Sequence, residues 1–320
     1  MVKKVILGTI AVLGLIVGVA WLMLRGPDIP YATLNAKYGG TGSGFVDLPD
    51  GVRLHFQAHG DAALPVIVLV HGYGDSFTSW EGWTKVLAPE HRVISIDMPG
   101  HGLTRAPEGY RASVAGYVAD VETFAAAQGL TRFAITGNSM GGGIAWQYAL
   151  AHPQRLSALI LVDAAGWPMP PPAELPLAFR ILQYRVGRWA LAQIDNRPLI
   201  SEGLRKDVYD PTVITEAFID RWAEFQRAPG HREILMSADL GSLGSATDAK
   251  LADLHVPTLV LHGEADPIIP LASGQHFASA IPGARIITYP KVGHLPQVEI
   301  PARSAADVAA FLAAPGQTSQ

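Results

Sequence analysis

The sequence predicts an α/β protein whose core is a mostly parallel β-sheet flanked by helices. Continuous β-branched or aliphatic runs recur at 66–70, 92–96, 159–162 and 285–289, as expected of strands that are buried on both faces. Segments with helical character separate these runs, one of them near 114–128. Parallel neighbours need a crossover connection, so the alternation of buried strands with helices favours a parallel sheet.

A glycine-flanked serine between a strand and a helix is the second observation. The segment 132–150 contains a short apolar run, the pattern Gly-x-Ser-x-Gly at 137–141, and then a helical stretch. Small residues around Ser139 allow the two arms of a tight turn to approach each other. Glycine turns before helices also bind phosphate, but G-x-x-x-x-G-K-[S/T] is absent here. We therefore interpret Ser139 as an exposed nucleophile, with the helix N-terminus favouring negative charge beside it.

Length, charge and cysteine content exclude several classes of protein. A chain of 320 residues that is 49% hydrophobic can bury a large core, and one domain with an insertion fits it. The net charge is −4, and the chain after residue 25 holds 21 basic and 28 acidic residues, net −7. This balance argues against a nucleic-acid partner. The absence of cysteine excludes disulfides, thiol catalysis and cysteine-ligated zinc.

The amino-terminal stretch predicts a membrane anchor. Residues 5–24 carry no charge, with Lys3 and Lys4 before them and Arg25 after them. A helix of this length reaches about 30 Å, which matches the apolar core of a bilayer. The positive-inside rule then leaves the amino terminus in the cytoplasm and places the catalytic part on the exported side. The alternative is a signal peptide cleaved near Ala20, which would give a secreted protein.

The remaining elements can be assigned in chain order. A glycine- and proline-rich stretch leads to a hairpin at 46–58, and the pattern of buried strands breaks after Gly166. Helical, aromatic-rich sequence follows until the strand at 258–261. We expect six segments: 1–25 membrane anchor or signal, 26–44 linker, 45–165 first part of the core, 166–246 helical cap, 247–314 second part of the core, and 315–320 frayed tail.

Several motifs together carry a family resemblance. His71-Gly72-Tyr73-Gly74 follows a strand, and Ser139, Asp266 and His294 occur in that order. Together with Asp97-Met98-Pro99-Gly100-His101-Gly102, they make residues 45–314 resemble the α/β-hydrolase fold serine hydrolases of the capped esterase and lipase group. The whole chain is similar to membrane-anchored monoacylglycerol-lipase-like hydrolases. The resemblance implies an α/β-hydrolase fold with a helical cap inserted after the sixth strand.

The same resemblance implies a role for each motif residue. Ser139 would be the nucleophile, His294 the general base, and Asp266 the acid that orients the imidazole. The backbone N–H groups of Tyr73 and Met140 would form the oxyanion hole.

Alternatives remain for some of these roles. Glu264 and Asp163 compete with Asp266, and Asp163 is the stronger rival because some relatives carry the acid at the end of the sixth strand. His71 is expected to brace its loop rather than react. Trp167 is a candidate substrate contact, because it lies nearest the exit of the sixth strand.

The predicted reaction is hydrolysis of carboxylic esters through an acyl-enzyme. The apolar, aromatic cap favours a small-molecule ester with an apolar acyl chain, and a membrane tether would favour lipid-like substrates. The sequence lacks H-E-x-x-H and a nucleotide-binding G-x-G-x-x-G, so we expect neither a metal nor a cofactor.

Other reactions are open within the same fold. Carbon–carbon bond hydrolases of ring-cleavage products share the sequence motif Gly-Asn-Ser-Met-Gly-Gly at 137–142. They also use an arginine of the cap, and Arg205 or Arg221 could take that role here. They typically carry tryptophan after the catalytic histidine, where this chain has Leu295. Cofactor-free haloperoxidase-like chemistry is a weaker option. The alternative that is not an enzyme is a catalytically silent α/β-hydrolase fold used as a binding module.

Overall fold

The computed structural model describes residues 24–168, 180–181 and 183–314, together with residues 9, 12, 14–16, 18, 19, 21 and 22. Its centre is an eight-stranded sheet with the strand order β1-β2-β4-β3-β5-β6-β7-β8. The strands are β1 (Ser43–Asp47), β2 (Arg53–His59), β3 (Val66–Val70), β4 (Arg92–Ile96), β5 (Phe133–Asn138), β6 (Leu156–Val162), β7 (Thr258–Gly263) and β8 (Arg285–Tyr289). Only the β1–β2 and β2–β4 pairs within this sheet are antiparallel, so the predicted mostly parallel sheet is confirmed.

Helices cover both faces of the sheet, because successive residues of each buried strand point to opposite sides. Val68 and Ile94 pack in one core cluster with helices α4 and α5, whereas Ile67 and Val93 pack in another with α3 and α14. The helices outside the insertion are α2 (Tyr31–Tyr38), α3 (Glu81–Leu87), α4 (Val114–Ala127), α5 (Met140–Ala151), α11 (Asp248–Ala252), α12 (Leu271–Ala280), α13 (Pro296–Glu299) and α14 (Pro301–Leu312). Short 3-10 turns are η1 (Phe77–Trp80), η2 (Pro153–Arg155), η3 (Pro211–Val213) and η4 (Gly241–Gly244).

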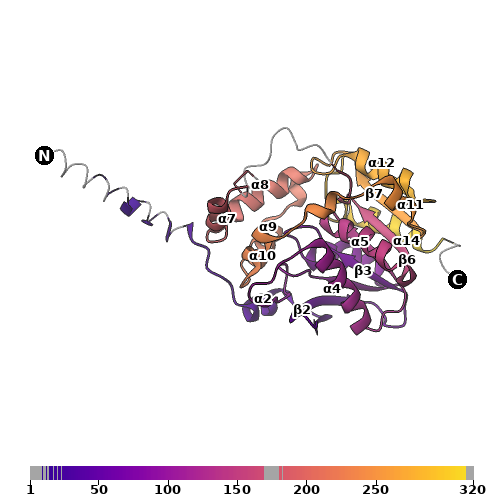
Figure 1. The fold of residues 1–320 in the computed structure, drawn as a ribbon, viewed down its shortest axis with the longest axis horizontal. Coiled ribbons are helices and arrows are strands. Elements are labelled where there is room, and N and C mark those ends of the chain that lie inside the picture. Colours follow the sequence, from indigo (N-terminus) through magenta and orange to yellow (C-terminus); the bar gives the residue numbers. More distant parts are fainter. Residues whose placement is uncertain are drawn as a thin grey trace.

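Residues 166–246, which we call the cap segment, connect β6 to the second part of the core. Their helices are α7 (Arg185–Leu191), α8 (Arg197–Asp207), α9 (Glu216–Gln226) and α10 (His231–Ser237). These helices lie together to one side of the strands (Figure 1). A small apolar cluster joins α8 and α9 to Leu295, the residue after His294. The cap segment therefore contacts the loop that carries the candidate base.

The segment expected to be a linker, residues 26–44, contains the helix α2. Pro30 precedes this helix, a position where its missing N–H costs no hydrogen bond. Leu34 is fully buried and packs in one cluster with Phe77 and Phe225. Glycine and proline content alone therefore missed an ordered helix that joins the chain to the cap segment.

The structure contradicts the membrane-spanning helix that we expected over residues 5–24. Among the residues that the structure describes, we find no helix with both the length and the apolar character needed to span a bilayer. The prediction rested on the absence of charge over this stretch, whereas a span also needs a helix of about 20 predominantly apolar residues. The described end of this stretch contacts the cap segment instead: the Trp21 ring stacks on Trp189 with 5.3 Å between centroids, and Arg25 bridges to Ile194.

The anchored, exported placement of the catalytic part depended on that helix and is withdrawn with it. Residues 1–8 and Ala20, where the alternative signal cleavage was placed, lie outside the described residues. The tail at 315–320, which we expected to be frayed, also lies outside them.

Candidate active site

Ser139 sits at the sharp turn between β5 and α5. Its backbone angles are φ 53° and ψ −116°, a combination that side-chain-bearing residues rarely adopt and that stores strain. Backbone hydrogen bonds hold it there: its N–H donates to the Val162 carbonyl at 3.0 Å, and its carbonyl accepts from the N–H groups of Gly143 and Ala165, also at 3.0 Å. The serine is thus fixed by the neighbouring strand and remains partly exposed.

Two glycines make this turn possible through close backbone approach. A Cβ atom at Gly137 would lie 2.0 Å from the carbonyl oxygen of Gly141. A Cβ atom at Gly141 would lie 2.1 Å from the carbonyl oxygen of Val70 in β3. Neither distance is compatible with a side chain, so the Gly-x-Ser-x-Gly spacing follows from packing.

The loop after β3 lies directly beside the serine. A Cβ atom at Gly72 would be only 3.4 Å from the Cβ atom of Ser139. His71 braces this loop, because its Nδ1–H donates to the Gly72 carbonyl at 2.7 Å and its Nε2 accepts from the Met98 N–H at 3.0 Å. Burial lowers the pKa of His71. A neutral ring with both nitrogens engaged is suited to bracing rather than to proton transfer.

The backbone N–H groups of Tyr73 and Met140 are the two candidate oxyanion donors. Met140 begins α5, so its N–H has no partner within the helix. Within the part of the chain that the structure describes, neither N–H donates a hydrogen bond to another protein group. Two such donors beside a nucleophile are what a developing oxyanion needs.

His294 and Asp266 are in direct contact. The His294 Nδ1–H donates to Asp266 Oδ2 at 2.7 Å, and Asp266 Oδ1 accepts from the N–H groups of Ile268 and Ile269 at 2.7 and 3.0 Å. Burial acts to lower the pKa of His294, but the charge and hydrogen bond of Asp266 raise it above its usual value. Burial likewise acts to raise the pKa of Asp266, but His294 and the two N–H donors hold it below its usual value.

Asn138, which the sequence reading overlooked, ties His294 to the serine turn. Its side-chain Nδ2 donates to the His294 carbonyl at 3.1 Å and to the Val162 carbonyl at 3.2 Å. Asn138 is buried and immediately precedes Ser139. A buried amide next to a nucleophile is the signal that could have revealed it, because buried amides are normally hydrogen-bonded to something specific.

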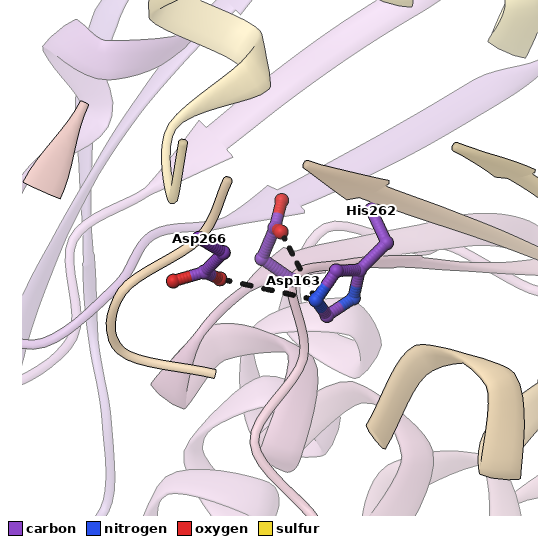
Figure 2. Close-up of side chains that lie close together, drawn as sticks. All are labelled: Asp163, His262 and Asp266. Atoms are coloured by element: carbon purple, nitrogen blue, oxygen red, sulfur yellow. Dashed lines mark ion pairs between the residues drawn. The ribbon is translucent and has the colours of Figure 1, made fainter. Parts of the chain in front are cut away.

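Asp163, the rival acid, lies beside Asp266, and both carboxylates form ion-pair contacts with His262 (Figure 2). Asp163 Oδ1 accepts from the Gly263 N–H at 2.9 Å and lies 3.6 Å from His262 Nε2. Single ligand atoms of Asp163, His262 and Asp266 lie within 4.8 Å of one another, a spacing that could hold a metal ion. However, His262 Nε2 donates to the Ile269 carbonyl at 3.0 Å, so its lone pair is not free for a metal. The group is better described as a hydrogen-bonded cluster with two carboxyl groups.

Asp163 provides a pH-dependent test of this cluster. Burial raises the pKa of Asp163 well above its usual value, and the charges of Asp266 and Glu299 add to the effect. A folded-state pKa above the unfolded value gives stability that is lost as pH rises, here from about pH 4 upward. Relative to the wild type, Asp163→Asn should therefore gain up to about 1.4 kcal/mol of unfolding free energy per pH unit. Denaturant unfolding at pH 5 and pH 7 measures this, and parallel pH dependence of the two proteins would contradict it.

The other candidate residues are dispersed. The Trp167 ring packs on His276 and Phe277 of α12, and its buried indole N–H has no partner among the described residues. The Arg205 guanidinium is occupied by Ser201 and by Glu216, the latter at 2.6 Å. Arg221 on α9 contacts Glu81 at 2.7 Å, and its buried Nε has no partner among the described residues.

The chain is similar to several known hydrolases. Residues 61–300 match the family model described as serine aminopeptidase, S33. The chain is 31% identical to 2-hydroxymuconate semialdehyde hydrolase of a Pseudomonas species over 268 residues, which are 82% of this chain and 91% of the relative. The structure of a meta-cleavage product hydrolase from Pseudomonas fluorescens has a TM-score of 0.73 at 24% identity, covering 85% of this chain and 98% of that chain. An esterase from Thermogutta terrifontis has a TM-score of 0.67 at 26% identity, covering 84% and 97%.

Proposed function

The chain belongs to the serine aminopeptidase S33 family of α/β-hydrolase fold serine hydrolases, and we propose that it hydrolyses a carbon–carbon bond of a ring-cleavage product. The sequence alone favoured ester hydrolysis. The 2-hydroxymuconate semialdehyde hydrolase that shares 31% identity over most of both chains supports the carbon–carbon alternative instead. Both reactions begin with nucleophilic attack on a carbonyl carbon, so the same residues serve either one.

In the proposed mechanism, Ser139 attacks the carbonyl carbon at position 6 of the substrate while His294 takes the proton of the serine hydroxyl. The N–H groups of Tyr73 and Met140 stabilise the resulting oxyanion. The substrate reacts as its keto tautomer, in which the dienol proton has moved to the carbon next to the attacked carbonyl. When the carbon–carbon bond breaks, the electron pair is delocalised over the unsaturated 2-oxo acid as a dienolate, and His294 returns the proton to it, so that it departs as a conjugated dienol acid. A water molecule, deprotonated by His294, attacks the acyl-enzyme and releases the second acid and the free serine. Asp266 keeps the Nδ1 proton on His294 throughout.

The observation that carries the choice of substrate is a pair of unpartnered donors on α9. Trp222 Nε1 and Arg221 Nε are buried and have no hydrogen-bond partner among the described residues. The Trp222 ring lies against the loop after β3, since a Cβ atom at Gly74 would be 3.4 Å from it. Burial raises the pKa of Asp75 in that loop to about 7, and the positive charge of Arg221 opposes this shift. These unpartnered N–H groups lie beside the loop after β3, which carries the Tyr73 N–H. They could donate hydrogen bonds to a substrate that has a carboxylate and an enol.

Replacing Arg221 tests this part of the proposal. We expect Arg221→Met to raise KM for a 2-hydroxy-6-oxo-dienoate by about 10- to 100-fold with a smaller change in kcat, because a charge-assisted hydrogen bond to the carboxylate is lost. Arg205→Met is the matched control, since each guanidinium pairs with a glutamate, but only that of Arg221 has a buried nitrogen without a partner among the described residues. Equal KM values for the two variants would remove Arg221 from substrate binding.

Ester hydrolysis is the second candidate, and Leu295 favours it. Leu295 is buried and packs with apolar residues of the cap segment, in the position where ring-cleavage hydrolases typically carry tryptophan. The structural similarity to an esterase at 26% identity is consistent with this reading.

A parallel assay separates the two candidates. 2-Hydroxymuconate semialdehyde and its 6-methyl and 6-phenyl analogues are followed by the loss of the absorbance of their dienolate, beside p-nitrophenyl esters of increasing acyl length. The proposal expects the higher kcat/KM on a dienoate. A higher kcat/KM on the esters, with no turnover of any dienoate, would replace it by the ester reading.

A further inference from the structure

Glu299 joins two parts of the molecule that are far apart in sequence. It ends the short helix α13, and its Oε1 accepts from the Gly293 N–H at 2.7 Å. Its Oε2 accepts from the Tyr209 N–H at 2.9 Å and from the Asp210 N–H at 3.4 Å. Gly293 immediately precedes His294, whereas Tyr209 and Asp210 follow α8 of the cap segment. One carboxylate therefore links the histidine loop to the cap segment.

A second set of contacts fixes the same pair of segments. The His294 N–H donates to the Asp207 carbonyl at 2.7 Å. A Cβ atom at Gly293 would lie 2.5 Å from that carbonyl oxygen and 2.7 Å from the Val208 Cα, so only glycine permits this approach. The chain from Asp207 to Asp210 thus lies directly on the backbone of the candidate base.

The charge of Glu299 also acts on the imidazole. Burial acts to lower the pKa of His294, and Asp266, Asp207 and Glu299 all raise it. These carboxylates come from the loop after β7, from α8 and from α13, and His262 on β7 and Asp163 after β6 are further titratable groups beside Asp266. Glu299 is therefore connected to His294 both through the backbone and through its charge.

We propose that Glu299 is a positioning residue that couples the cap segment to His294, so that its two hydrogen-bonded oxygens hold the general base in place. The inference rests on the proposed role of His294 as the base. It requires the two oxygens of Glu299 to accept from Gly293 and Tyr209 at the same time. A glutamine offers only one acceptor oxygen and places an NH₂ group against a backbone N–H, so it can keep one link at most.

The test measures the rate at which a small fluorophosphonate labels Ser139, because labelling needs the base but not any particular substrate. We expect Glu299→Gln to label about 10- to 100-fold more slowly, as misplaced catalytic groups do. The acid limb of its labelling profile should also move to lower pH, because a charge that raises the pKa of His294 is removed. Glu264→Gln is the matched control, since it makes the same charge change at an exposed residue that contacts Thr288.

The outcomes distinguish this inference from the proposed function. Wild-type rate and pH profile in Glu299→Gln would overturn the coupling and leave the proposed function intact. Absence of labelling in the wild type would overturn both. If Glu299→Gln unfolds, Glu299→Asp keeps the charge but shortens the reach, so it should label slowly with an unshifted pH profile. A wild-type rate in Glu299→Asp would contradict the coupling.

Discussion

Replacement of Ser139 by alanine should abolish turnover while leaving the fold unchanged. We expect kcat to fall by about 10⁴- to 10⁶-fold, the range seen when a serine nucleophile is removed from a triad. Alanine keeps the Cβ atom, so the hydrogen bonds that hold the turn at φ 53° depend only on backbone atoms that remain. The melting temperature should therefore stay close to that of the wild type. Substantial turnover by a folded Ser139→Ala protein would exclude Ser139 as the nucleophile.

Replacement of Asp266 by asparagine should lower kcat by about 10⁴-fold. Asp266 accepts the Nδ1–H of His294 at 2.7 Å and so keeps Nε2 available as a base. An asparagine can present its NH₂ group to Nδ1, which stabilises the opposite tautomer and leaves a proton on Nε2 facing the serine.

Asp163→Asn provides the matched control for this experiment. The Asp163 side chain accepts from the Gly263 N–H, and it has no hydrogen bond to His294 among the described residues. An asparagine at 163 preserves a neutral group of the same shape, so we expect kcat within a few-fold of the wild type. The opposite ranking of the two variants would assign the acid to Asp163.

Much of the core could be predicted from the sequence, because the central strands are buried on both faces. Such strands appear as continuous aliphatic runs, and those at 66–70 and 92–96 coincide with β3 and β4, whereas the run at 285–289 coincides with the partly buried edge strand β8. The turn around Ser139 could also be predicted from the sequence, because close backbone contacts require its glycines. These features depend on local sequence, which periodicity and composition report well.

Features that depend on pairing between distant segments were harder to predict. Asp163 and Asp266 both follow strands, and only the neighbouring positions of β6 and β7 bring the two carboxyl groups together. The links from Asn138 and Glu299 to the His294 loop join backbone groups that carry no sequence signal of their own. The membrane helix was predicted incorrectly, because among the described residues no helix combines the length and the apolar character that a bilayer span needs.

The triad motif also does not determine which of the two reactions the protein catalyses. Ester and carbon–carbon bond hydrolysis share the nucleophile, the base and the oxyanion donors, and differ in the group that leaves. Selection between them falls to the groups around the substrate, such as Arg221 and Trp222 on α9. The similarity to 2-hydroxymuconate semialdehyde hydrolase supports carbon–carbon bond cleavage, which the sequence alone indicated only as an alternative to ester hydrolysis.

The most direct test of Ser139 as the nucleophile is to identify the residue that a fluorophosphonate modifies. The full chain is treated with the probe, digested and analysed by peptide mass spectrometry, beside Ser139→Ala treated in the same way. We predict one phosphonylated residue, Ser139, and no adduct in the variant. An adduct on another residue, or an unmodified Ser139 in folded protein, would contradict the claim that this serine is the nucleophile.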